Sequence, residues 1–292
     1  MKSLHSPFVF GAIALVILIS SLCQEPEAPT PTTKPLRILI TNDDGVDSAG
    51  IAELAKAFST MGEVTVCAPP ANRSGASHSS QLFSGPAELT KGSLEGAKEV
   101  WIIDGTPSDC VTFGIVHLGK DRPFDLVVSG INHGNNVGMV AHYSGTVGAA
   151  MEGSMHGVLS MAVSQDVPRG TDGDYLLAAK FSVELAHKLR AENAPTHLVY
   201  NVNLPTSDRE LLKGVASAPM GGIYIKVPRY SINEVDGKSM LQAHPRFNMD
   251  HPENSDTALF YQGNITVTAL RTNWSDAAMM KTMQGWDLRV SE

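Results

Sequence analysis

The feature that most constrains the fold is an alternation of short apolar runs and helical periods that begins at Leu36. The run 36–40 is almost continuously apolar, as expected of a strand buried on both faces. A helical face at 51–58 follows, and Gly62 ends it before a second apolar run. Continued alternation of this kind predicts an α/β fold with a parallel sheet covered by helices on both faces. Further strands are expected at 63–67, 100–103, 125–128, 159–163 and 198–202, and further helices at 146–157 and 174–190.

The pattern changes after residue 213, where long helical periods are replaced by strand-like runs at 223–227, 230–235 and 264–270. Residues 36–213 are therefore predicted to form the α/β core. Residues 214–292 are predicted to form a β-rich C-terminal extension that completes the domain. Part of this extension could form a hairpin arm, which would be suited to contacts between subunits.

The N-terminus has the organisation of an export signal. Lys2 precedes an uncharged apolar run at 8–19, which is short for a membrane span and typical of a secretory signal. Cys23 follows, and a Pro- and Thr-rich tether extends to residue 35. We expect a signal peptide at 1–22, export to the periplasm and a lipid on Cys23, although Ser20-Ser21-Leu22 departs from the usual lipoprotein pattern. An uncleaved anchor would lead to the same compartment.

Composition limits how the chain can bind phosphate. The formal net charge is −8 over 292 residues, which disfavours binding to a nucleic-acid duplex. A phosphate group would therefore have to be bound by a local feature, such as a metal ion or the amides of a helix N-terminus.

Oxygen-bearing side chains follow several of the predicted strands. Asp43 and Asp44 follow the first strand, Ser74 lies beyond the second, and Asn132 lies beyond the strand at 125–128. Because functional groups gather at the carboxyl ends of parallel strands, we expect these oxygens to converge. Adjacent carboxylates repel each other, and an all-oxygen donor set suits Mg²⁺, Mn²⁺ or Ca²⁺. The alternative for Asp43 and Asp44 is a simple turn with a helix-capping Asp.

A second candidate binding feature is the sequence Ser144-Gly145-Thr146, which precedes a predicted helix. Its free amides and the helix dipole could hold a phosphate, although an ordinary helix cap would look the same. We expect this turn, rather than Arg73, to provide most of the phosphate recognition. Gly145→Val is accordingly expected to weaken phosphate binding and largely spare metal binding.

Two enzyme classes are disfavoured by the residues at the strand ends. A haloacid-dehalogenase phosphatase needs a nucleophilic Asp where this chain has Asn42. A serine hydrolase needs a Gly-x-Ser-x-Gly elbow, and none follows these strands. Any one of His78, His133 and His142 is a candidate general acid, and each is also readily explained as a surface residue.

Five segments together resemble the SurE family in order and spacing. They are ITNDDG at 40–45, NRSG at 72–75, GTPSDCV at 105–111, SGINHGNNVG at 129–138 and SGTV at 144–147. The resemblance implies a Rossmann-like sheet, a divalent metal and 5'/3'-nucleotidase activity on nucleoside monophosphates. It implies one metal ion per subunit and assigns roles residue by residue: metal ligands Asp43, Asp44, Ser74 and Asn132, and a phosphate pocket lined by Asn136, Ser144, Gly145 and Thr146.

The resemblance leaves some alternatives open. Asp43 and Asp44 are the expected catalytic residues, with Asp43 either attacking phosphorus or holding the ion that activates a water molecule. Residues 218–224 match the family poorly, so the substrate preference is not fixed. A homodimer or a homotetramer is expected. The rival interpretation is a non-catalytic periplasmic lipoprotein that binds nucleotides or phosphate, which would not need the paired acids.

Overall fold

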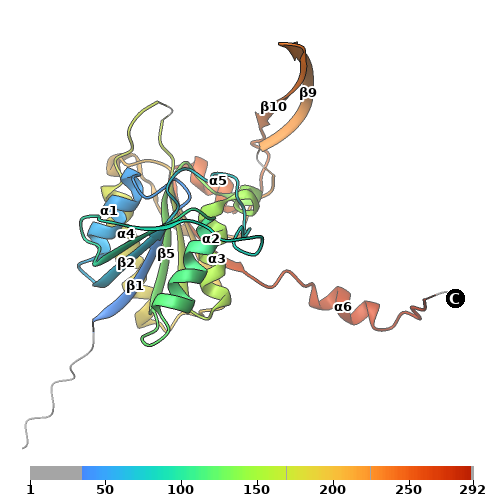
Figure 1. Ribbon diagram of the computed structural model, residues 1–292. Coiled ribbons are helices and arrows are strands. Elements are labelled where there is room, and N and C mark those ends of the chain that lie inside the picture. Colours follow the sequence, from blue (N-terminus) through green and yellow to red (C-terminus); the bar gives the residue numbers. More distant parts are fainter. Residues whose placement is uncertain (1–34, 169, 224, 291–292) are drawn as a thin grey trace, which may run out of the picture. The chain divides into compact units, whose positions relative to one another are not determined.

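A computed structural model of the chain describes residues 35–168, 170–223 and 225–290. The predicted signal peptide, Cys23 and the tether up to residue 34 lie outside these residues. The central element is a nine-stranded sheet in the order β3-β4-β2-β1-β5-β6-β7-β11-β8 (Figure 1). Its strands are β1 (Leu36–Thr41), β2 (Gly62–Ala68), β3 (Leu89–Gly92), β4 (Glu99–Ile103), β5 (Leu126–His133), β6 (Leu159–Gln165), β7 (Leu198–Leu204), β8 (Gly214–Ser217) and β11 (Asn264–Arg271).

The sheet is mostly parallel, which confirms the predicted fold class. All pairings from β4 through β7 are parallel, whereas β3 and β11 pair antiparallel with β4 and β7. β8 and β11 come from the predicted C-terminal extension and lie inside this sheet. The extension therefore contributes directly to the main fold.

Helices cover both faces of the sheet because its central strands are apolar on both sides. Ile38, Leu39 and Ile40 are all fully buried. Ile38 and Ile40 share a core cluster with α1 and α4, whereas Leu39 packs in a cluster with residues of α2 and α3. Figure 1 shows these helices beside the sheet. The helices are α1 (Ala49–Phe58), α2 (Pro107–Phe113), α3 (Gly145–Met155), α4 (Leu176–Ala191), α5 (Asp256–Tyr261) and α6 (Ala277–Met283). None of those in the described part of the chain is long and apolar enough to cross a bilayer.

A second sheet consists of a long antiparallel hairpin, β9 (Ile225–Val235) and β10 (Lys238–Phe247). The prediction of two separate strands at 223–227 and 230–235 is wrong, because β9 runs through Pro228 without a break. A register irregularity between His244 and Arg246 on β10 lies opposite this proline. A bulge there accommodates a residue that cannot donate a ladder hydrogen bond.

Two cysteines lie in the apolar layer between the sheet and α2. Cys67 of β2 and Cys110 of α2 are completely buried, free and members of one core cluster. Burial raises the pKa of both thiols far above the ordinary value. Both therefore act as small buried hydrophobic residues.

Candidate active site

The candidate site forms where β1 and β5 end side by side. Thr41 pairs with Ser129, so Asp43 and Asp44 leave β1 beside the last residues of β5. β5 continues to His133, beyond the predicted end at residue 128, with a register shift against β6 between Ser129 and Asn132. This extension places Asn132 at the end of a strand rather than in a loop.

Hydrogen bonds from two other segments converge on Asp44. Its Oδ2 accepts the peptide N–H of His133 at 3.0 Å, and its Oδ1 accepts the side-chain amide of Asn72 at 3.3 Å. Asn72 in turn accepts the peptide N–H of Ser74 at 2.8 Å, and the N–H of Arg73 donates to the carbonyl of Asp43 at 2.7 Å. Three segments, which together carry all four predicted ligand positions, are therefore joined around the carboxylate of Asp44.

The N-terminus of α3 faces Asp43. Ser144 caps the helix by accepting the N–H of Val147 at 3.2 Å. The hydroxyl of Thr146 donates to Oδ1 of Asp43 at 2.5 Å, so the predicted phosphate turn is partly engaged by the acid. Among the described residues, the N–H of Gly145 is one donor of this turn without a protein acceptor.

The close approach of Gly145 to Asp43 corrects one expectation. A Cβ on Gly145 would lie 2.9 Å from the Cβ of Asp43 and 3.0 Å from its Oδ2. Gly145→Val would therefore displace Asp43 as well as crowd a phosphate. The expectation that this substitution spares metal binding does not hold.

Burial makes the charged form of both Asp43 and Asp44 less favourable than it is in water. Asp43 is 3% exposed, and burial raises its pKa to about 6, while hydrogen bonds from Thr146 act in the opposite direction and the charge of Asp44 adds to the rise. Burial also raises the pKa of Asp44. Within the residues that the structure describes, no basic side chain forms an ion pair with either acid, and Arg73 pairs with Asp104 instead. A bound cation would relieve this buried negative charge.

The donor chemistry fits a hard divalent ion. No group of three His, Cys, Asp or Glu side chains that could hold a metal occurs among the described residues. An ion here would therefore use the two carboxylates with neutral oxygens from Ser74 and Asn132. The amide nitrogen of Asn132 donates to the carbonyl of Gly134 at 2.7 Å, which leaves its side-chain oxygen available as an acceptor. The four ligand assignments remain predictions.

Asn136 is held in a buried polar network that the sequence analysis missed. Its peptide N–H donates to Asn203 at 2.6 Å, its carbonyl accepts from Asn201 at 3.0 Å, and its side-chain amide donates to Ser164 at 2.9 Å. A phosphate contact by Asn136 would have to use its second amide hydrogen. The signal in the sequence was the pair of asparagines within the apolar run of β7.

Asp256 is a second residue that was missed, at the start of α5. It is 1% exposed and accepts the N–H groups of Gly138 at 3.0 Å, Gly221 at 2.7 Å and Thr257 at 2.6 Å. These contacts join the segment before Ser144 to Gly221, which lies shortly before the hairpin strand β9. We call this arrangement the Asp256 clamp.

The three candidate histidines have different surroundings. His78 bonds Glu152 at 2.7 Å, and His142 lies edge-on to Trp274 with ring centroids 5.7 Å apart. His133 contacts the hydroxyl of Tyr175 at 2.9 Å, and its own peptide N–H donates to Asp44. Of the three, His133 is the one joined directly to the acid pair.

Comparisons with known proteins cover most of the chain. The family described as Survival protein SurE matches residues 38–226. The chain is 37% identical over 254 residues to 5'-nucleotidase SurE of Chloroflexus aggregans, across 86% of this chain and 98% of that protein. It is 35% identical over 247 residues to 5'-nucleotidase SurE of Clostridium beijerinckii, across 84% and 96%. The crystal structure of the SurE protein from Aquifex aeolicus superimposes with a TM-score of 0.74 at 33% identity, across 85% of this chain and 98% of that one.

Proposed function

Because the chain belongs to the SurE family, we propose that it is a divalent-metal-dependent phosphatase that hydrolyses nucleoside 5'- and 3'-monophosphates to nucleoside and phosphate. Its relatives carry the name 5'-nucleotidase, so the enzyme class is that of a hydrolase acting on phosphate esters. The observation that carries the proposal is the buried carboxylate of Asp43 beside the partly buried carboxylate of Asp44, at the N-terminus of α3. Among the described residues, neither acid forms an ion pair with a basic side chain.

Four residues are proposed to hold one Mg²⁺, Mn²⁺ or Ca²⁺ ion: Asp43, Asp44, Ser74 and Asn132. When bound, such an ion supplies charge that polarises the phosphoryl oxygens. The chain supplies the remaining parts. Thr146 fixes the carboxylate of Asp43, and the partial positive charge of the helix start and the N–H of Gly145 face the phosphate.

Asp43 has the reactive role in both mechanisms that remain open, as the group that attacks phosphorus or the group that orients a water molecule. Asp44 holds the peptide of His133 and the amide of Asn72 in place. Of the three candidate histidines, His133 is the one whose backbone is held beside the acid pair, and its imidazole contacts the hydroxyl of Tyr175. This imidazole is the candidate donor of a proton to the leaving oxygen.

The rival function, non-catalytic capture of nucleotide or phosphate, is less well supported. Two adjacent carboxylates, one buried and one partly buried, have no basic partner among the described residues and would repel a phosphate dianion unless a cation lay between them. A binding protein has no need of that arrangement, whereas a metal-dependent phosphatase does.

Phosphate release by the purified protein tests the proposal. We expect turnover of nucleoside monophosphates that is lost on chelation with EDTA and restored by Mn²⁺, Mg²⁺ or Ca²⁺. Equilibrium binding of the same nucleotides serves as the second readout. Tight binding without turnover, whichever ion is added, would favour the rival function.

We also propose that the chain is exported and held at the membrane by a lipid on Cys23. The support is the signal-like N-terminus and the Pro- and Thr-rich tether. In bacteria expressing the full chain, wild-type protein should sediment with membranes, and Cys23→Ser protein should lose both this association and the mass of the lipid. Membrane association that is the same in both would contradict lipidation.

A homodimer or homotetramer is proposed from the hairpin. Its strands pair only with each other and expose Ile232, Met240 and Leu241. Burial of these side chains between subunits would remove a sizeable apolar surface from water. Sedimentation of wild-type protein and of Leu241→Asp protein measures the number of subunits and the contribution of the hairpin.

A further inference from the structure

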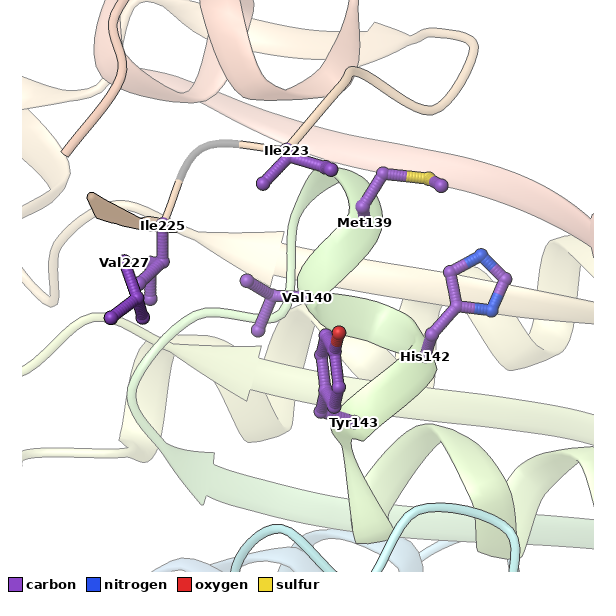
Figure 2. Close-up of a pocket in the computed structure, with 7 residues that line it drawn as sticks. All are labelled: Met139, Val140, His142, Tyr143, Ile223, Ile225 and Val227. Atoms are coloured by element: carbon purple, nitrogen blue, oxygen red, sulfur yellow. The ribbon is translucent and has the colours of Figure 1, made fainter. Parts of the chain in front are cut away.

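An apolar cavity lies beside the start of α3, and none of the assigned roles uses it. Its volume is about 730 Å³. Figure 2 shows Tyr143 and Val140 lying between His142 on one side and Ile225 and Val227 on the other. Its walls come from two segments. One is the 3₁₀ segment η2 (Gly138–Tyr143), and the other is the hairpin root, by which we mean Ile223, Ile225 and Val227. The lining residues are Met139, Val140, His142, Tyr143, Ile223, Ile225 and Val227.

The position of the cavity relates it to the proposed phosphate site. Tyr143 immediately precedes Ser144, the cap of α3, so their Cα atoms are about 3.8 Å apart. A phosphate at the N–H of Gly145 would therefore leave the rest of a nucleotide within reach of the Tyr143 ring. The Asp256 clamp fixes this relation, because it holds Gly138 at the start of η2 and Gly221 beside the hairpin root.

The lining chemistry favours a flat aromatic group. Five of the seven lining side chains are aliphatic or thioether groups. Only the Tyr143 hydroxyl and the His142 ring can form hydrogen bonds, and none of these seven residues is a carboxylate or a Lys or Arg. Tyr143 is 70% exposed, which leaves much of its side chain accessible for stacking.

We propose that this cavity holds the nucleobase of the substrate, stacked on Tyr143 and covered by the hairpin root. The proposal rests on the proposed function and extends it to the leaving group. Because stacking tolerates any base whereas hydrogen bonds discriminate, the enzyme should require a base and accept both adenine and guanine. Purines should be preferred to pyrimidines because they present the larger stacking surface.

A second cavity, of about 530 Å³, lies on the other side of Ile225 and is the competing location. Its lining includes His133, Gly134, Asn135 and the carboxylate of Asp166, with Asn135 donating to Asp166 at 3.3 Å. Phe247 and Tyr261 also line this second cavity and could contact a ring, but Asp166 places a carboxylate among them. The first cavity has no carboxylate in its lining and therefore suits the face of a base better. The two locations can be separated by substitution, because each has an exposed apolar side chain of its own.

The test compares kcat/KM for AMP, GMP, CMP and the base-free ester ribose 5-phosphate. Wild-type enzyme should favour the purine nucleotides over ribose 5-phosphate by about tenfold or more, because stacking of one base is worth that much. Tyr143→Ala should lower this preference by about tenfold, with a smaller effect on ribose 5-phosphate itself.

Three matched charge substitutions locate the base. Val227→Asp introduces a carboxylate in the proposed cavity, Met249→Asp does so in the second cavity, and Val235→Asp does so on β9 away from both. These side chains are 41%, 59% and 52% exposed, so none should prevent folding. Only Val227→Asp should reduce the preference for nucleotides over ribose 5-phosphate.

The outcomes separate this inference from the proposed function. Equal turnover of AMP and ribose 5-phosphate, or a loss of preference caused by Met249→Asp and not by Val227→Asp, would overturn the base site while leaving the phosphatase intact. Turnover of no ester would refute the phosphatase. In that case calorimetric titration with adenosine decides the base site alone: binding that Tyr143→Ala weakens about tenfold supports it, and binding that this substitution leaves unchanged overturns it.

Discussion

Asp43→Asn is expected to lower kcat/KM for nucleoside monophosphates by about a thousandfold or more, because it removes a proposed ligand and the reactive carboxylate together. An asparagine keeps the size of the side chain and can still accept the hydrogen bond from Thr146. The fold should therefore be retained. Steady-state phosphate release at saturating Mn²⁺ measures the loss.

Asp47→Asn is the matched control for this substitution. Asp47 lies in the same loop and its side chain is exposed, so the same chemical change there should leave turnover within about twofold of wild type. Near-normal activity of well-folded Asp43→Asn protein would remove Asp43 from the reaction.

Asp43→Asn should also raise the free energy of unfolding of the metal-free protein at neutral pH. Burial raises the pKa of folded Asp43 to about 6 from an ordinary value of 3.8. Between these values the folded state retains a proton that the unfolded state has lost, so the free energy of unfolding falls as pH rises. Above pH 6 this effect of Asp43 amounts to about 3 kcal/mol.

Urea unfolding in EDTA at pH 4, 5, 6 and 8 tests this effect. Asp43→Asn should be more stable than wild type at pH 8 and lose most of that advantage at pH 4. An unchanged pH dependence in the variant would show that Asp43 is not under the electrostatic stress described here.

Asp256→Ala is expected to destabilise the protein by about 4 kcal/mol and to reduce activity as well. The substitution leaves three peptide N–H groups without their acceptor in a buried site, and each such loss costs about 1–3 kcal/mol before relaxation. Release of Gly138 also frees the segment that leads into Ser144, so kcat/KM should fall in the fraction that remains folded. Urea unfolding and phosphate release measure the two effects.

Asp276→Ala provides the comparison. Asp276 also accepts a peptide N–H at a helix start, from Met279 at 2.6 Å, but its surroundings are exposed. Its loss should cost about 1 kcal/mol and leave turnover unchanged. If Asp256→Ala were no more damaging than this control, the Asp256 clamp would have no structural importance.

Much of the sheet could be predicted because its central strands are apolar on both faces. The predicted run at 36–40 is one residue shorter than β1, and the run at 63–67 is one residue shorter than β2 at each end. β3 and β8 were missed because each has four mostly exposed residues and therefore no burial pattern. No helix was predicted for the residues of α2, since seven residues are too few to show a helical period.

The elements of the site that could be predicted are those that follow strands in the chain. Asp43, Asp44 and Asn132 could be located because parallel strands bring their carboxyl ends to one edge. The supporting contacts could not be found in this way. Asn136 and Asn203 are 67 residues apart, and Gly138 and Asp256 are 118 residues apart, and no local pattern records such pairs.

The two buried thiols provide a way to follow the separation of α2 from the sheet. Only the thiolate reacts readily with alkylating or oxidising reagents, and Cys67 and Cys110 combine complete burial with a raised pKa. They lie on β2 and α2, so both become accessible only when the sheet separates from that helix. Labelling of these side chains therefore reports the opening of the core itself, and movements of the hairpin or the site loops leave them unmodified.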